Sequence, residues 1–166
     1  MAFGVLSAKG RALRYLAQRE HSRAELARKL ARTVVDTEAA TASQQIQAAL
    51  DELVAHGLLN EERAAASVLN VQGRSFGERR LKQNLQHKGF APELVAQTLA
   101  QARGTELERA CAVWQRKFGE PPQNARERAR HMRFMLGRGF LGHVVVQVLR
   151  SAGCPAAAED AEPGSF

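Results

Sequence analysis

The chain has 166 residues, of which 45% are hydrophobic and only 5% aromatic. That length allows one ordinary domain or several very small ones, and the hydrophobic share argues against wholesale disorder. Lys and Arg outnumber Asp and Glu by 24 to 17, a net charge of +7. This balance favours nucleic acid, an anionic membrane or an acidic protein as a partner, without choosing among them.

The N-terminal residues MAFGVLSAKGR are too few and too weakly apolar to predict a signal peptide. No apolar run approaches the roughly 20 residues that a membrane-spanning helix needs. We therefore expect a cytoplasmic protein with no membrane partner.

Helix-forming patterns follow one another at short intervals, and patterns typical of strands are scarce. Capping-box sequences at Ser22-x-x-Glu25 and Ser75-x-x-Glu78 predict helix starts, and Gly57 predicts a helix end. Val144-Val145-Val146 is the one competing strand pattern, but its spacing to Leu149 is helical. The expected helices cover 11–19, 22–32, 43–56, 61–72, 75–88, a segment that opens at Pro92, 105–118, 124–137 and 141–151.

A repeat of about fifty residues links the later helices. Lys88-Gly89-Phe90 recurs as Arg138-Gly139-Phe140, fifty residues further on. Glu62-Arg63-Ala64 recurs as Glu108-Arg109-Ala110 at a shift of forty-six. The difference falls at the loop of Pro121-Pro122, where an insertion costs little. The first helices align less cleanly, so we infer a three-helix unit used three times, with the first copy the most diverged.

The repeat predicts an all-α chain of three tandem three-helix modules, similar to helix-turn-helix units, in an elongated arrangement. A unit of this size barely buries a core alone, so neighbouring copies should pack on one another. The last residues are rich in Ala, Pro, Gly and acid, which is typical of a disordered tail. The expected boundaries are 1–9 for an N-terminal segment, 10–57, 58–103 and 104–152 for the repeats, and 153–166 for the tail.

The second helix of the middle and last repeats is strongly basic. Residues 74–88 and 126–138 each carry a net charge of about +4. With Leu81 and Leu85, or Met132, Phe134 and Met135, on the buried face, the cations point outward, either as a solvated face or as a binding surface. Arg in place of Lys suits bidentate contact with phosphate or carboxylate. The candidate partner- or DNA-binding residues are Arg74, Arg79, Arg80, Lys82, Lys88, Arg126, Arg130, Arg133 and Arg138.

The Lys/Arg-Gly-Phe endings have a structural explanation. The glycine after Lys88 or Arg138 should adopt a left-handed conformation that ends the helix, with the following Phe packed beneath it. The cation before it suits the negative end of the helix.

Patterns of enzymes and metal sites are absent from the sequence. It contains no GxxxxGK[ST], HExxH or GxSxG. Cys111 and Cys154 lack CxxC or Cys/His spacing, and His131 falls among the buried positions of its helix. We expect no catalytic residue, no metal and no cofactor.

Three segments resemble the bacterial RecX family of regulatory proteins. They are REHSRAELARKL at 19–30, GLLNEERAAASVL at 57–69 and GRSFGERRLKQNLQHKGF at 73–90, in the family's order and spacing. The resemblance covers about residues 10–151. The second segment departs from the family, which usually has an Asp-rich start and an aromatic where Asn60–Ala65 stands.

The resemblance implies a non-enzymatic modulator of the RecA recombinase that binds in the groove of the RecA filament on single-stranded DNA. Such proteins inhibit the ATPase, strand-exchange and co-protease activities of RecA, and so regulate DNA repair and the SOS response. Contact with single-stranded DNA would be weak or made through the filament. We expect a monomer, with a domain-swapped dimer as the alternative. The functional alternatives are a stand-alone helix-turn-helix-like DNA-binding protein and a scaffold for another acidic protein.

Overall fold

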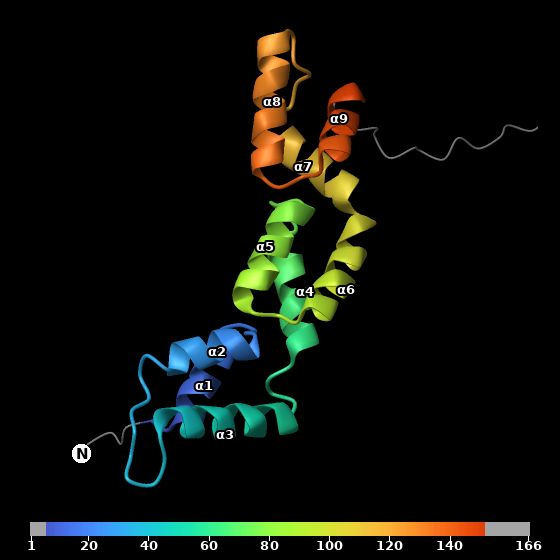
Figure 1. The fold of residues 1–166 in the computed structure, drawn as a ribbon. Helices are drawn as coiled ribbons and strands as arrows, with labels where there is room; N and C mark the ends of the chain where they lie inside the picture. The colour runs from blue at the N-terminus through green and yellow to red at the C-terminus, as the bar shows by residue number, and fades with distance from the viewer. Residues whose placement is uncertain (1–5, 152–166) are drawn as a thin grey trace, which may run out of the picture. The chain divides into compact units, whose positions relative to one another are not determined.

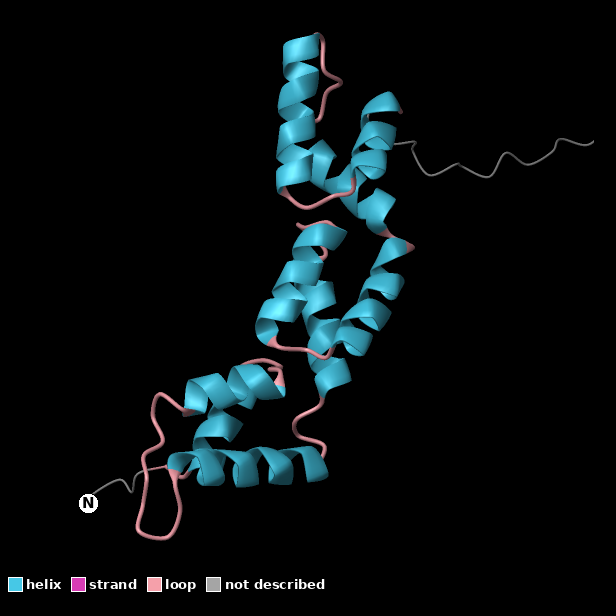
Figure 2. Cartoon of the chain, viewed as in Figure 1, coloured by secondary structure: helices cyan, strands magenta, loops and turns pink. Residues whose placement is uncertain are grey.

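The computed structural model describes residues 6–151, and the structural statements below concern that part of the chain. Within it the structure has nine helices and no strand, so the predicted all-α class is confirmed (Figures 1 and 2). The helices are α1 Ala8–Leu16, α2 Arg23–Leu30, α3 Ala42–Ala55, α4 Glu61–Gln72, α5 Glu78–Lys88, α6 Pro92–Arg103, α7 Glu106–Lys117, α8 Ala125–Gly137 and α9 Gly142–Arg150. The predicted tail, 153–166, lies outside the described residues.

Two helix starts differ from the prediction by three residues, and the others agree with it to within one residue. Helix α1 begins at Ala8 rather than at 11, because the side chain of Ser7 accepts a hydrogen bond from the Gly10 N–H at 3.1 Å and caps the helix. Helix α5 begins at Glu78, so the predicted capping role of Ser75 is wrong. The Gly77 carbonyl accepts the first intrahelical hydrogen bond instead, from the Leu81 N–H at 3.1 Å.

The chain forms two compact units, each described below by itself. The first comprises Met1–Val71 and Lys82–Thr98, and the second comprises Gln72–Leu81 and Leu99–Phe166. Helices α5 and α6 therefore each contribute residues to both units. The elongated arrangement of the repeats stays a prediction.

The first unit is built on α1, α2 and α3, which all contact one another. Helical spacing places Ile46, Leu50 and Leu53 on one face of α3, as predicted, and all three are buried. The core cluster consists of Ala12, Leu26, Leu30, Ile46, Leu50, Leu53 and Leu59.

The second unit is built on α7, α8 and α9, which likewise contact one another. Val144, Val145 and Val146 lie in α9, so the helical interpretation of that run is confirmed. Of the face predicted to be buried on α8, Met135 is fully buried, whereas Met132 and Phe134 are partly buried at the edge of the core. The core cluster consists of Ala110, Val113, Trp114, Met135, Phe140, Val144, Val145, Val148 and Leu149.

Candidate functional site

Helix α5 separates an apolar face from a basic one, as its sequence predicts. Leu81 and Leu85 are each only 1% exposed. Arg79, Arg80 and Lys82 are exposed, and none of the three forms an ion pair within residues 6–151. These three cations of α5 are therefore available to an anionic partner.

Helix α8 presents a second basic face. Asn124 caps the helix by accepting a hydrogen bond from the Glu127 N–H at 2.9 Å. Arg126, Arg130 and Arg133 are exposed, and they too have no ion-pair partner in the described part of the chain. The Arg130 guanidinium lies 5.8 Å from the centre of the Phe118 ring, within the range of a cation–π contact.

Lys88, by contrast, is engaged inside the first unit. Its ammonium donates to Glu25 Oε2 at 3.0 Å, and the two side chains are only 19% and 13% exposed. Arg19 donates to the same carboxylate. Burial alone would raise the pKa of Glu25, but the hydrogen bonds from Arg19 and Lys88 outweigh it and lower the pKa to about 2. The contact gives Lys88 a role in stability.

The Gly-Phe ending of α5 meets the start of α2. Gly89 has φ +80°, as predicted, and Phe90 is buried. Ser22 Oγ donates to the carbonyl of Lys88. A Cβ on Gly89 would lie 2.6 Å from the Cβ of Ala24, so the two backbones approach too closely for any other residue.

The Gly-Phe ending of α8 meets the start of α5 in a corresponding way. The N–H of Gly77 donates to the Arg138 carbonyl, and the N–H of Arg79 donates to the Gly139 carbonyl, both at 3.0 Å. Gly139 has φ +85°, and a Cβ on it would lie 2.6 Å from the backbone nitrogen of Arg80. We call these two contacts the Gly-Phe joints.

A carboxylate from the next repeat completes the capping at each joint. Glu106 is 3% exposed, and its Oε1 accepts hydrogen bonds from the Glu78 N–H at 3.2 Å and the Leu141 N–H at 3.3 Å. In the first unit, Glu61 Oε1 accepts from the N–H of Arg23, the first residue of α2. In both units, a side-chain carboxylate thus accepts a hydrogen bond from a backbone N–H at the start of a helix, where no acceptor from the same helix is within reach.

A cationic pocket lies at the C-terminal end of α7. It has a volume of about 280 Å³, and its lining residues include three cations and no carboxylate. The sequence predicts a role for Arg138 but not for Arg116 and Lys117, because these two lie on the first helix of their repeat, outside the strongly basic second helices. The residues that line it are Ser75, Val113, Arg116, Lys117, Phe134 and Arg138.

Aromatic rings make cation–π contacts with two cations of this pocket, Lys117 and Arg138, and with Arg80. The Arg138 guanidinium lies 5.1 Å from the centre of the Phe134 ring and 5.5 Å from that of Phe76. Arg80 lies 5.7 Å from the Phe76 ring, and the Lys117 ammonium lies 5.6 Å from the Phe134 ring. The structure thus brings together two predicted residues, Arg80 and Arg138. Arg74, two residues before Phe76, is exposed, and its backbone carbonyl accepts a hydrogen bond from the Arg116 guanidinium at 2.9 Å.

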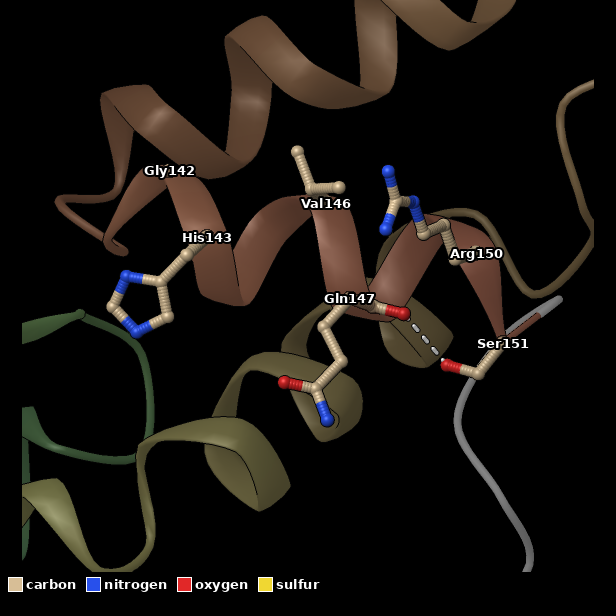
Figure 3. Close-up of a pocket in the computed structure, with 6 residues that line it drawn as sticks. All are labelled: Gly142, His143, Val146, Gln147, Arg150 and Ser151. Carbon is tan, nitrogen blue, oxygen red and sulfur yellow. Dashed lines mark hydrogen bonds between the residues drawn. The ribbon is translucent and has the colours of Figure 1, made fainter.

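Another pocket, of about 620 Å³, runs along one side of α9 (Figure 3). Its described lining residues are Gly142, His143, Val146, Gln147, Arg150 and Ser151. The Ser151 hydroxyl donates to the Gln147 carbonyl at 2.8 Å, so it is engaged in ending the helix. His143 and Arg150 lie toward opposite ends of the helix, and no acidic side chain stands between them among these residues.

Neither a metal site nor a membrane span is found in the described part of the chain. No group of three or more His, Cys, Asp or Glu side chains could hold a metal ion there. No helix in residues 6–151 is long and apolar enough to span a membrane.

Comparison with known proteins gives a consistent set of matches. Residues 8–53 match the model for the first three-helix domain of RecX, and residues 105–149 match that for the third. The protein named Regulatory protein RecX from Leptothrix cholodnii is 51% identical over 147 residues, which cover 89% of this chain and 90% of the relative. Its namesake from Ralstonia nicotianae is 41% identical over 147 residues, which cover 89% of each protein.

Solved structures show the same fold. The crystal structure of RecX from Lactobacillus salivarius matches with a TM-score of 0.69 at 17% identity, covering 87% of this chain and 94% of that one. A second crystal structure, of regulatory protein RecX, matches with a TM-score of 0.66 at 20% identity, covering 87% of this chain and 71% of that one.

Proposed function

This chain belongs to the RecX family of regulatory proteins, and from that premise we propose that it inhibits the RecA recombinase. It binds in the helical groove of the RecA filament on single-stranded DNA. The observation that carries the proposal is the row of exposed arginines on α8, Arg126, Arg130 and Arg133, which have no carboxylate partner among the described residues.

The basic faces of α5 and α8 act as separate weak contacts within one chain. Each contributes charged hydrogen bonds to acidic filament surfaces, to DNA phosphates or to both. Because the faces are covalently linked, binding of one raises the effective concentration of the other, and the whole chain binds more tightly than either face alone.

Occupation of the groove has defined consequences for RecA. It blocks filament extension or promotes disassembly, and so lowers ATPase, strand-exchange and co-protease activity. In the cell, this inhibition regulates DNA repair and the SOS response. The protein makes this contact in the cytoplasm as a monomer, and its direct contact with single-stranded DNA is weak.

The test is a RecA ATPase assay on single-stranded DNA with this protein titrated in. We expect the wild type to inhibit. The triple variant Arg126→Glu, Arg130→Glu and Arg133→Glu should need at least about tenfold more protein for the same inhibition, with the largest difference at low salt. The reason is that three attractive contacts with the negatively charged partner become repulsive, while the fold of the protein stays the same.

A charge-matched control separates this surface from net charge. Arg14, Arg32 and Arg150 are exposed cations outside the candidate faces. Their triple change to Glu alters the net charge by the same amount and should leave inhibition within about twofold, because screened surface charges act only over about a Debye length. Full inhibition by a folded Arg126/Arg130/Arg133 variant would remove this face from the proposal.

The alternative is a stand-alone DNA-binding protein. It is favoured by the pairing of a basic second helix with a three-helix unit, the arrangement by which helix-turn-helix proteins approach a duplex. A mobility-shift assay on duplex DNA without RecA distinguishes the two. Tight, sequence-selective binding would favour this alternative, and weak binding with strong ATPase inhibition would favour the RecA regulator.

A further inference from the structure

The cationic pocket at the end of α7 is lined by three cations and no carboxylate, which favours an anionic ligand. We propose that it binds a phosphate group, carried by a nucleic-acid strand or by a free nucleotide. This inference goes beyond the proposed function, because it concerns side chains of this chain alone and is tested without the recombinase.

The pocket supplies hydrogen-bond donors from several directions. Arg116 and Arg138 each carry a guanidinium with five N–H donors, Lys117 carries an ammonium, and Ser75 carries a hydroxyl. None of its lining residues is acidic, so no carboxylate in the pocket neutralises these cations. Donors of this kind are the ones that proteins commonly direct at phosphate oxygens.

The excess of positive charge favours phosphate over carboxylate. A single carboxylate has two oxygens and one negative charge, which leaves most of the charge of three cations unbalanced. A terminal phosphate has three non-bridging oxygens and a charge between −1.5 and −2 near neutral pH. Each phosphodiester of a strand carries one charge, but neighbouring phosphates of the same strand add theirs. The number and spread of the donors therefore match a phosphate better than an acidic side chain.

The cations are held in place before any ligand arrives. Lys117 and Arg138 both lie against the Phe134 ring, at 5.6 and 5.1 Å from its centre. Arg116 donates to the Arg74 carbonyl at 2.9 Å through one nitrogen, which leaves its remaining N–H groups free to bind. Side chains already fixed lose less conformational entropy on binding, which raises affinity.

Other cations of the chain contrast with this pocket. Arg103 donates through two nitrogens to Glu78, and Arg63 donates to Glu20. These cations are already paired with carboxylates. The pocket instead keeps Arg116 and Lys117 exposed beside the partly buried Arg138, without an ion pair among the described residues.

The experiment is a titration followed by amide NMR of Ser75, Lys117 and Arg138. The probes are sodium phosphate, a short oligothymidylate with a 5′-phosphate, the same oligothymidylate without it, and a poly-glutamate peptide. The test protein is the double variant Arg116→Gln and Lys117→Gln. The control is Arg14→Gln and Arg32→Gln, which removes two exposed charges elsewhere.

We expect saturable shifts at the pocket with at least one phosphate-bearing probe. Affinity should fall by about tenfold or more in the Arg116/Lys117 variant and change by less than about twofold in the control, because each lost charged hydrogen bond weakens binding substantially. Tighter binding of the 5′-phosphorylated oligonucleotide identifies a terminal phosphate as the ligand. Equal binding of both oligonucleotides identifies the backbone phosphodiester.

Two outcomes would overturn the assignment. One is that the wild type and the Arg116/Lys117 variant bind every phosphate-bearing probe with equal affinity, or that neither protein binds any of them. The other is saturation of the pocket by poly-glutamate alone, which would make it a site for an acidic protein. Circular dichroism confirms that each variant is folded.

Discussion

Glu25 is a residue whose charge stabilises the first unit. It receives hydrogen bonds from Arg19 and Lys88, and its pKa is lowered from 4.5 to about 2. Because the folded pKa lies below the unfolded one, this carboxylate adds stability above about pH 4.5. That contribution is lost as the pH falls from about 4.5 towards about 2.

Replacing Lys88 by Met should remove one of the two cations that hold Glu25. We expect the free energy of unfolding at neutral pH to fall by about 1.5–3 kcal/mol, the range for a hydrogen bond to a charged group. The dependence of stability on pH between about 4.5 and 2 should also become shallower. Urea denaturation followed by circular dichroism at several pH values measures both effects.

Lys82→Met is the matched control. Lys82 is exposed and forms no ion pair within the described residues, so its loss should change stability by no more than about 0.5 kcal/mol. Equal destabilisation by the two substitutions would contradict the role given to the Lys88–Glu25 pair.

His131 shows how far helical periodicity predicts a single residue. Its position on α8 predicts a core histidine, and the structure confirms this with 3% exposure. Its partners come from α7 and from the residue that follows α7. The Trp114 Nε1–H donates to His131 Nδ1 at 3.3 Å, and the Phe118 ring stacks on the imidazole at 3.6 Å between ring centres. Periodicity predicts burial but cannot predict partners from another helix.

The helix endings at Gly89 and Gly139 repeat one hydrogen-bond pattern. The Phe90 N–H donates to the Leu85 carbonyl, and the Phe140 N–H donates to the Met135 carbonyl, each at 3.3 Å. This six-to-one bond with a left-handed glycine defines a Schellman ending, so the predicted form of both endings is confirmed. The prediction did not include the helix start that each ending meets.

Three glycine substitutions separate conformational strain from close approach. Gly57 has φ +67°, but no atom lies within 4 Å of the position that a Cβ would occupy, so Gly57→Ala should cost about 1–2 kcal/mol from the left-handed backbone alone. Gly139 adds the close approach to Arg80, so Gly139→Ala should cost clearly more. Gly142 lies in a helix with open space around it, and Gly142→Ala should change stability by less than about 1 kcal/mol.

Chemical denaturation of the three variants measures this order. Similar losses for Gly57→Ala and Gly139→Ala would mean that the joint adapts to a methyl group. The close approach would then contribute little to docking of the α8 ending on α5.

Carboxylates at helix starts illustrate a limit of reasoning within one element. The macrodipole accounts for acids at the beginning of α4 and α7. In the structure, however, Glu61 and Glu106 bond to the N–H groups of another helix, at Arg23 and Glu78. These partners lie 38 and 28 residues away, beyond the reach of any local sequence pattern.

The whole chain combines a repeated fold with a net excess of positive charge. The net charge of +7 is predictable from composition, and it suits an anionic filament or nucleic acid. The choice of RecA as the partner rests on family membership, because charge alone attracts any polyanion. Because the three-helix unit is repeated, the chain carries more than one basic helix face.

An elongated row of repeats predicts a large radius of gyration. A compact protein of this length would have a radius of gyration of about 15 Å, and we expect a clearly larger value from small-angle X-ray scattering. Light scattering gives the mass of the same sample. A monomer with a radius near 15 Å would contradict the row, and twice the monomer mass would indicate the domain-swapped dimer.

Local sequence determines the helices, their glycine endings and the repeat of this protein, because capping and 3.6-residue periodicity depend on neighbours along the chain. Only the tertiary structure decides what those endings meet. Gly77 packs against the backbone of Phe140, and Ser22 binds the carbonyl of Lys88, across more than sixty residues in each case. The cationic pocket has the same origin, since Arg116 and Arg138 come together through packing of α7 and α8.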